Sequence, residues 1–174
     1  RFMNTKPKTV AVMRRLLGLR TVAVMRRLLG LRTVAVSGGF DPIHVGHARM
    51  FVEAKKLGDK LIVIINNDNW LHKKKGKIFM PQEERKELIE HLRAVDEVIL
   101  TNHIPNTDDM SVCDALRDIK PDIFANGGDR VSDNIPEVQV CKELGIEMVF
   151  NVGHGGKVQS SSWLLKKWEG KDTE

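Results

Sequence analysis

The sequence has little cysteine and no long apolar run, and each absence removes a class of protein. Its two cysteines, Cys113 and Cys141, lie far apart in the 174-residue chain and form no metal-ligand spacing. Two isolated thiols are typical of a reducing compartment, so we expect a cytoplasmic protein. The longest apolar run after the N-terminal region, residues 61–65, has the length of a buried strand. It is far too short to span a membrane.

Acidic residues are missing from residues 1–32, which hold nine of the 28 Lys and Arg residues. The rest of the chain carries 19 basic side chains against 23 acidic ones. The high isoelectric point of the chain, about 9.3, is therefore caused by this N-terminal arm, and the rest of the chain is mildly acidic. Overall basicity is thus weak evidence for nucleic-acid binding, and we expect no nucleic-acid partner.

The arm contains a 12-residue repeat. TVAV begins at Thr9, Thr21 and Thr33, and the first two copies are followed by the same eight residues, MRRLLGLR. Twelve residues advance an α-helix by three turns plus about 120°, so the repeat keeps no single helical face. We interpret residues 1–32 as a basic arm with a duplicated unit outside the catalytic core. An arm that binds a membrane, a partner or nucleic acid is the alternative.

From Thr33 onward, short apolar runs alternate with amphipathic segments. The predicted strands are 33–37, 60–66, 96–101, 122–126 and 147–152, and the predicted helices are 47–58, 81–95, 110–120, 136–145 and 160–170. The apolar runs suit strands that are covered on both faces. The alternation predicts an α/β fold with a Rossmann-like, doubly wound, five-stranded parallel sheet. Ligands of such sheets bind beyond the carboxyl ends of the strands.

The loop after the first strand reads SGGFDPIHVGH. Gly38 and Gly39 predict a tight turn that lets the backbone approach a ligand. Asp41 before a proline is typical of a helix N-cap followed by the first helical residue. His44 and His47 are three residues apart, so on a helix they share a face. Two imidazoles at a helix N-terminus predict a site for anionic oxygens.

FDPIHVGH resembles the HxGH signature of the nucleotidyltransferase superfamily that includes the cytidylyltransferases. AKKLGDKLIVIINND, RAVDEVI and PDIFANGGD follow in order and resemble glycerol-3-phosphate cytidylyltransferases and heptose-phosphate adenylyltransferases. The resemblance covers residues 33–168, which we take as the nucleotidyltransferase domain, with a C-terminal tail at 169–174. It implies transfer of CMP or AMP from CTP or ATP to a phosphorylated sugar or polyol, release of pyrophosphate, and a homodimer.

Two alternatives remain open. FDPIHVGH also fits mononucleotide and pantetheine-phosphate adenylyltransferases. An inactive nucleotide- or nucleic-acid-binding protein that uses the basic arm is the alternative from another class.

The resemblance also implies the site residues. His44, His47 and Lys74 are the expected catalytic residues. The expected nucleotide- and phosphate-binding residues are Gly38, Gly39, Phe40, Asp41, Gly46, Lys75, Lys77, Arg85, Gly128, Asp129, Ser160, Ser161 and Ser162. The lysines are expected on a flexible loop, 71–77, that closes over the triphosphate. Mg²⁺ is expected to bridge the nucleotide phosphates.

Two of the expected phosphate-binding features lie on predicted helices. In the helix at 81–95, Leu88 is expected to face the core and Arg85 to clamp a phosphate from the opposite, exposed face. The serines are expected to cradle phosphate at the start of the last helix. The arginine that cytidylyltransferases carry just before these serines is missing here. Lys157 and His154 are the candidates to replace it.

Deletion of residues 10–33 tests the interpretation of the arm. It joins Thr9 to Val34 and restores a single TVAV before the glycine turn. We expect the rate of pyrophosphate release to stay nearly unchanged, because no site residue lies in the deleted segment. A variant that loses its folded circular dichroism spectrum would show instead that the arm is part of the core.

Overall fold

The computed structural model describes residues 25, 28–127, 135–153 and 159–170, and the chain divides into two compact units, Arg1–Arg32 and Thr33–Glu174. In the first unit, the Leu29 N–H donates to the Met25 carbonyl at 3.0 Å, and Gly30 has a φ of +65°. The rest of the duplicated segment lies outside the described residues, so its interpretation stays a prediction. None of the described helices is long and apolar enough to cross a membrane.

The second unit is built on a five-stranded parallel sheet with the order β3-β2-β1-β4-β5. The strands are β1 (Thr33–Gly38), β2 (Lys60–Ile65), β3 (Glu97–Leu100), β4 (Ile123–Ala125) and β5 (Glu147–Val149). The central strand β1 pairs with β2 from Thr33↔Lys60 to Gly38↔Ile65. Each predicted strand is present, and the predicted Rossmann-like parallel sheet is confirmed.

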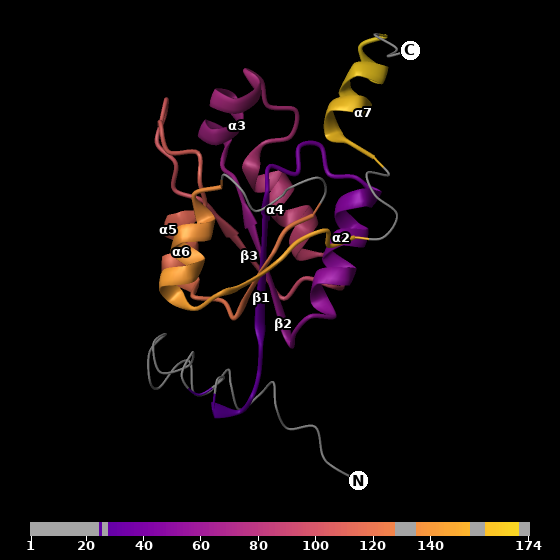
Figure 1. Cartoon of the computed structure of the whole chain (residues 1–174). Helices are drawn as coiled ribbons and strands as arrows, with labels where there is room; N and C mark the ends of the chain where they lie inside the picture. The colour runs from indigo at the N-terminus through magenta and orange to yellow at the C-terminus, as the bar shows by residue number, and fades with distance from the viewer. Residues whose placement is uncertain (1–24, 26–27, 128–134, 154–158, 171–174) are drawn as a thin grey trace. The chain divides into compact units, whose positions relative to one another are not determined.

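Helices cover both faces of this sheet. The helices on the two faces are α2 (Val45–Lys55), α4 (Gln82–Glu90), α5 (Cys113–Ile119) and α6 (Glu137–Leu144). Two more helices, α3 (Asp68–Lys75) and α7 (Ser161–Trp168), lie beyond the carboxyl ends of the strands. Phe51 of α2 and Ile89 of α4 belong to the core cluster on one face. Leu116 of α5 and Val140 of α6 belong to the cluster on the other face. Figure 1 shows α2 and the α5–α6 pair on opposite sides of β1, as expected for a doubly wound sheet.

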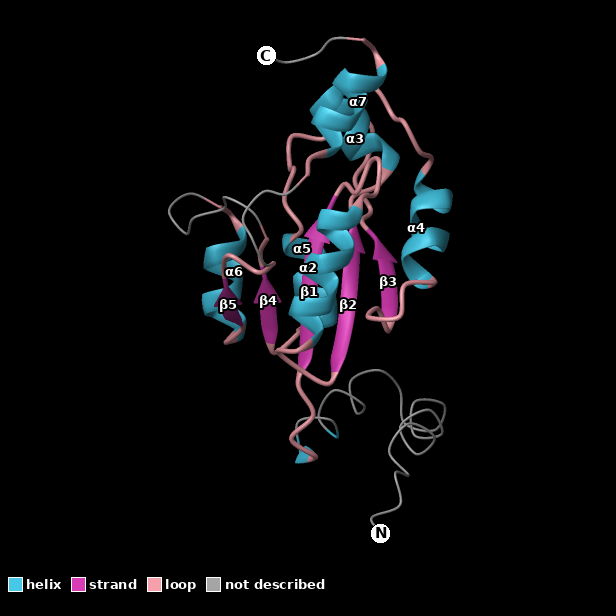
Figure 2. Cartoon of the chain, turned by 90° about the vertical axis from the view of Figure 1, so that its right-hand side faces the viewer, coloured by secondary structure: helices cyan, strands magenta, loops and turns pink. Residues whose placement is uncertain are grey.

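The carboxyl ends of the strands point toward the remaining helices. Figure 2 shows the strand arrowheads directed toward α3 and α7, which lie beyond the end of the sheet. The loops after β1, β2 and β3 therefore open at the edge where ligands of parallel sheets bind.

Helix α3 corrects the prediction of a flexible lysine loop at residues 71–77. The Asn67 side chain accepts a hydrogen bond from the Trp70 N–H at 3.0 Å and caps the start of α3. Gly76, with a φ of 72°, ends it in the left-handed conformation. Leu71 is the only buried residue of α3, so periodicity gave no helical signal. The two cap residues were the signal that the sequence did contain.

Helix α4 differs from the prediction in its length and in its buried face. It ends at Glu90, five residues before the predicted end. Leu88, expected to face the core, is 46% exposed, whereas Arg85, expected on the exposed face, is completely buried. Arg85 and Ile89 are four residues apart and form the buried stripe.

The Arg85 guanidinium joins three loops at the carboxyl edge of the sheet. Its Nη1 donates to the carbonyl oxygens of Gly39 at 2.6 Å and of Asn66 at 2.8 Å. Its Nε donates to the Met80 carbonyl at 2.9 Å, and its Nη2 to the Asp68 carboxylate at 2.7 Å. These bonds use four of the five guanidinium N–H groups. The expected exposed position of Arg85 is therefore wrong. Its role as a phosphate clamp, for which one N–H group is left, stays a prediction.

Replacement of Arg85 by Ala should lower the free energy of unfolding by about 3–5 kcal/mol, because the buried partners of a lost charge are left unpaired. Urea unfolding measures this loss. Lys86→Ala is the matched control on the adjacent, partly exposed position, and we expect a change within about 0.5 kcal/mol. A loss for Arg85→Ala that equals the control would contradict the assigned role.

Candidate active site

The loop between β1 and α2 is shaped by the Phe40 side chain, which is 4% exposed. Phe40 has a φ of 51°, so the left-handed residue of this turn is a phenylalanine. Its ring meets the Phe51 ring edge-on at 5.2 Å and the His47 ring at 5.0 Å between centroids. The ring thus supports His47 from the core side. Phe40 is a packing residue in this structure.

The two glycines before Phe40 make room for neighbouring side chains. A Cβ atom on Gly38 would lie 2.8 Å from the Phe40 ring, and one on Gly39 would lie 2.9 Å from the Leu71 side chain. Gly38 is also the last residue of β1. The positive φ of this turn thus falls on Phe40, and the two glycines leave room for the Phe40 and Leu71 side chains. Their close approach to a ligand stays a prediction.

Asp41 fixes a second loop beside the site. Its carboxylate is 1% exposed and accepts hydrogen bonds from the N–H groups of Phe79 at 2.9 Å and Met80 at 2.7 Å. The predicted N-cap role is wrong, since α2 begins at Val45 with His44 at the N-cap position. Asp41 instead holds the segment that follows α3 against the loop that follows β1.

His44 and His47 come together at the N-terminus of α2, with Gly46 between them in the first turn. Their rings stack with centroids 3.6 Å apart and an interplanar angle of 20°. The His44 N–H points to His47 Nδ1 at 3.3 Å, so this nitrogen acts as an acceptor. Neutral His47 consequently carries its proton on Nε2. Within the described part of the chain, buried His44 Nδ1 has no hydrogen-bond partner.

Both imidazoles are neutral in the free protein at neutral pH. Burial, followed by the repulsion that a protonated His47 would meet from His44 and from Lys75, lowers the pKa of His47 to about 3. Burial and Lys75 also lower the pKa of His44 below its usual value. The pair therefore offers hydrogen-bonding groups rather than fixed positive charge. A bound anion would reverse part of this effect, because an opposite charge favours the protonated form.

Lys75 is the cation that the structure brings to the histidines. Its Nζ donates to the Asp41 carbonyl at 2.8 Å, and burial of this ammonium lowers the pKa of Lys75. Lys74, the predicted catalytic lysine, is exposed on α3 and makes no hydrogen bond or ion pair with the described residues. Lys77 lies past the end of α3 and forms an ion pair with Glu169. The catalytic role of Lys74 stays a prediction, and Lys75 is better placed.

Helix α7 begins next to the histidine loop. The Ser161 hydroxyl donates to the Pro42 carbonyl at 2.9 Å, which brings the predicted serine motif to the first loop. Ser160 occupies the N-cap position without a side-chain capping bond, and Ser162 is exposed. Trp168, near the other end of α7, meets Phe79 edge-on at 6.5 Å. Helix α7 thus contacts both the histidine loop and the segment that Asp41 holds.

The loop after β4 is described only up to Gly127. A Cβ atom there would lie 2.4 Å from the Met50 sulfur and 3.1 Å from the Val152 carbonyl oxygen, so a larger residue would have to displace the Met50 side chain of α2. The predicted residues Gly128 and Asp129 lie outside the described residues. The same holds for Lys157 and His154.

The described residues of this site do not fit a resident Mg²⁺ ion. The described residues contain no group of three or more His, Cys, Asp or Glu side chains that could hold a metal ion. The side chains that meet are two imidazoles and an ammonium, whereas Mg²⁺ prefers oxygen ligands. The Asp41 carboxylate is already engaged by two backbone N–H groups.

The fold and the histidine pair agree with the comparisons with known proteins. A family model described as cytidylyltransferase-like matches residues 35–157, more than half of the chain. The chain belongs to this family. The resemblance to the nucleotidyltransferase superfamily and the assignment of the chain as a nucleotidyltransferase are thereby confirmed at the level of the family.

Curated relatives of this family member carry the name FAD synthase. The relative from Picrophilus torridus is 33% identical over 133 residues, which cover 75% of this chain and 91% of the relative. That from Pyrococcus horikoshii is 36% identical and is covered over 74% of its length. That from Ferroglobus placidus is 42% identical over 97 residues, and this chain spans only 59% of its length.

Solved structures support the same fold. A lipopolysaccharide core biosynthesis protein from Thermoplasma volcanium superposes with a TM-score of 0.57 at 30% identity, covering 72% of this chain and all of that one. A bifunctional NMN adenylyltransferase/ADP ribose pyrophosphatase from Francisella tularensis gives a TM-score of 0.52 at 17% identity over 80% of this chain and 43% of that one. The second likeness concerns the fold alone.

The low pKa of His47 predicts an acid sensitivity that depends on this side chain. The unfolded chain binds a proton on His47 near pH 6.5, whereas the folded protein does so only near pH 3. The protein thus loses stability as the pH falls through this window. When the pH falls from about 7 to about 4.5, the free energy of unfolding should drop in the wild type by on the order of 2 kcal/mol more than in His47→Gln.

Urea unfolding at the two pH values measures this difference. His91→Gln is the matched control, since His91 is exposed. It should lose as much stability as the wild type on acidification. Equal acid losses in His47→Gln and the wild type would contradict the assignment of a neutral, buried imidazole.

Proposed function

We propose that this chain is an FMN adenylyltransferase, which converts ATP and FMN to FAD and pyrophosphate. The observation that carries the proposal is the similarity to relatives named FAD synthase, one of which is covered over 91% of its length. The proposal agrees with the adenylyltransferase alternative drawn from the sequence. It replaces the sugar- or polyol-phosphate acceptor that the sequence favoured.

The proposed reaction needs no redox change and no strong general base. An oxygen of the FMN phosphate, already anionic near neutral pH, attacks the α-phosphorus of ATP. The new P–O bond completes the diphosphate of FAD, and the bond to the β-phosphate oxygen breaks to release pyrophosphate. The protein must place the two phosphates in line and stabilise the charge that develops on their oxygens.

The geometry of the histidine pair supports this role. His47 Nε2–H is a donor for a phosphate oxygen, the His44 ring stacks beside it, and Lys75 supplies the positive charge. Neutral donors near a single cation suit a polyanionic transition state, because they add hydrogen bonds without repelling the lysine. The serines at the start of α7 would contact the terminal phosphates. Mg²⁺ would enter with ATP, as part of the nucleotide substrate.

A comparison of two neighbouring lysines tests the assignment of the cation. Lys75→Ala should lower kcat/KM for ATP by about 10²–10³-fold, since it removes charge from the reacting phosphates. Lys74→Ala, on the exposed part of the same helical turn, is the matched control. This variant should change kcat/KM for ATP by less than about threefold. His47→Ala should abolish pyrophosphate release while the protein stays folded. Equal effects of the two lysine variants would count against Lys75.

A substrate panel tests the function itself. The full chain is incubated with Mg²⁺ and either ATP or CTP, together with FMN, glycerol 3-phosphate or a heptose phosphate, and pyrophosphate is measured. We expect turnover with ATP and FMN, with FAD as the coupled product. Turnover confined to a sugar or polyol phosphate would overturn the proposal and restore the acceptor that the sequence favoured.

A further inference from the structure

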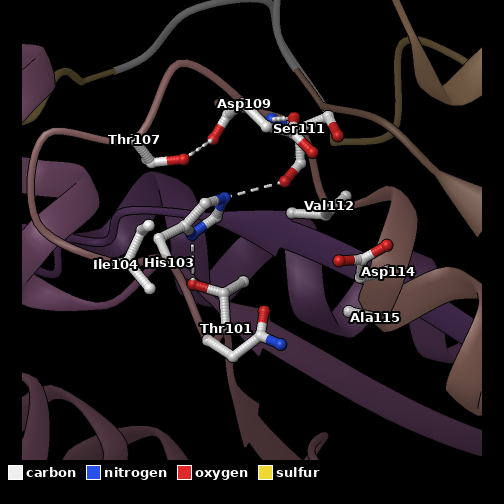
Figure 3. A pocket seen from close by; sticks show the side chains of 10 residues that line it. Thr101, His103, Ile104, Thr107, Asp109, Ser111, Val112, Asp114 and Ala115 are labelled. Carbon is white, nitrogen blue, oxygen red and sulfur yellow. Dashed lines mark hydrogen bonds between the residues drawn. The ribbon is translucent and has the colours of Figure 1, made fainter.

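A separate pocket opens at the carboxyl end of β3. It has a volume of about 260 Å³ and lies between the loop at 101–112 and the first turn of α5. Thr101, His103, Asp109, Asp114 and Ala115 are among the lining side chains in Figure 3. Since sites for whole ligands measure about 300–1,000 Å³, this pocket suits one end of a larger molecule.

A chain of hydrogen bonds fixes the wall of the pocket. The Asn67 N–H donates to Thr101 Oγ1 at 3.0 Å, and this hydroxyl lies 2.7 Å from His103 Nδ1. His103 Nε2 lies 2.9 Å from the Ser111 carbonyl oxygen, which can only accept (Figure 3). His103 therefore donates from Nε2 and accepts from Thr101 at Nδ1. Both ring nitrogens are engaged, so the loop is held in one shape before any ligand arrives.

The lining of the pocket excludes a phosphate group. Two carboxylates contribute to it, and Lys and Arg are absent from the described residues that line it. Asp109 accepts a hydrogen bond from the Ser111 N–H at 2.8 Å, and bonds from the Ser111 side chain and backbone lower the pKa of Asp109. Asp114 pairs with Arg117 at the surface of α5. Carboxylates attract N–H and O–H donors and repel phosphate, while Ala115 adds an apolar surface.

Helix α3 connects the pocket to the histidine pair. At its start, the side-chain amides of Asn67 and Asn69 donate to the His103 carbonyl at 2.8 and 2.9 Å, and Trp70 Nε1 donates to the Met110 carbonyl at 2.8 Å. At its end, Lys75 reaches the histidine loop. Eight helical residues span about 12 Å, so one elongated molecule can reach both places.

The strand order assigns the pocket to the acceptor rather than to the nucleotide. In the order β3-β2-β1-β4-β5, the chain reverses its direction of winding between β1 and β4. This switch point, beside Gly127, is where such sheets bind a nucleotide. The pocket lies at β3, on the other side of the histidine loop. The nucleotide would therefore bind on one side of the histidine loop, at the switch point, and the acceptor on the other side, at the pocket.

We propose that the pocket binds the uncharged ring and polyol end of the phosphorylated acceptor, with the acceptor phosphate at His44 and His47. The inference rests on the proposed function and extends it. In FMN, the five-carbon ribityl chain separates the phosphate from the ring. The imide N–H of the ring and the ribityl hydroxyls are donors of the kind that Asp109 and Asp114 accept.

Filling the pocket tests the proposal. Ala115→Leu places a larger side chain at its wall, and Asp118→Leu places a leucine at an exposed position of α5 outside it. We expect KM for FMN to rise about tenfold or more in Ala115→Leu with KM for ATP unchanged. Asp118→Leu should leave both constants unchanged. A folded Ala115→Leu with an unchanged KM for FMN, or with an increase in KM for ATP alone, overturns the proposal.

A second, conservative pair keeps the test valid where Ala115→Leu fails to fold. Asp114→Asn removes one carboxylate of the pocket while keeping its shape, and Asp118→Asn removes one outside it. We expect KM for FMN to rise about three- to tenfold in Asp114→Asn alone, because a charged acceptor is lost. Equal values in the two variants overturn the proposal.

Binding of riboflavin separates this proposal from the proposed function. Riboflavin has the ring and polyol but no phosphate, and quenching of its fluorescence reports binding without ATP or turnover. We expect the wild type to bind it and Ala115→Leu to bind it at least about tenfold more weakly. If the wild type binds riboflavin in this way but makes no FAD, the proposed function fails and the pocket stands. If it makes FAD but Ala115→Leu binds riboflavin as tightly as the wild type, the pocket fails and the function stands.

Discussion

The positions of the loops at the carboxyl edge of the sheet depend on one buried side chain, the guanidinium of Arg85. Arg85 is completely buried and donates to the backbone after β1, the backbone after β2 and the segment before α4. A charge removed from water is tolerated only where its N–H groups find partners, so these loops are held in positions that satisfy it. None of these loops has regular structure to fix it. The shape of the site therefore follows from the requirements of Arg85.

The rest of the site follows from this arrangement step by step. Arg85 holds Gly39, and two residues later Asp41 binds the N–H groups of Phe79 and Met80. The Asp41 carbonyl then receives Lys75 from the end of α3. Burial first, and then nearby Lys75, lower the pKa of both histidines and favour their neutral form. Lys75 is thus the positive charge beside the neutral pair, and an anion bound there would favour proton uptake by the imidazoles.

The sequence predicted the features that repeat and missed those that depend on a single contact. Each buried strand has its own apolar run, and the histidines stand in a recognisable motif, so both were found. Helix α3 buries only Leu71, and a pattern search has nothing periodic to detect there. Arg85 and Asp41 were placed by residue type, as surface arginine and helix cap. Charged residues are rarely buried. The burial of Arg85 and Asp41 is explained only by their hydrogen-bond partners in the folded chain, such as the backbone of Met80, which binds both.

The choice between Lys74 and Lys75 could not be made from composition, because neighbouring lysines in one run are equivalent as a pattern. A helix separates them, since successive residues differ by about 100° in direction. Lys75 therefore reaches Asp41 while Lys74 remains in solvent.

The two ends of α3 carry charge of opposite sign. Its first turn holds Asp68 and its last turn holds His72, Lys73, Lys74 and Lys75. This order complements the helix dipole, with negative charge at the amino end and positive charge at the carboxyl end. The arrangement that stabilises the helix also places Lys75 beside His44 and His47. The pocket lined by Asp109 and Asp114 lies at the other end of α3. In the proposed complex, the positive end of the helix would therefore face the acceptor phosphate and the negative end its uncharged ring.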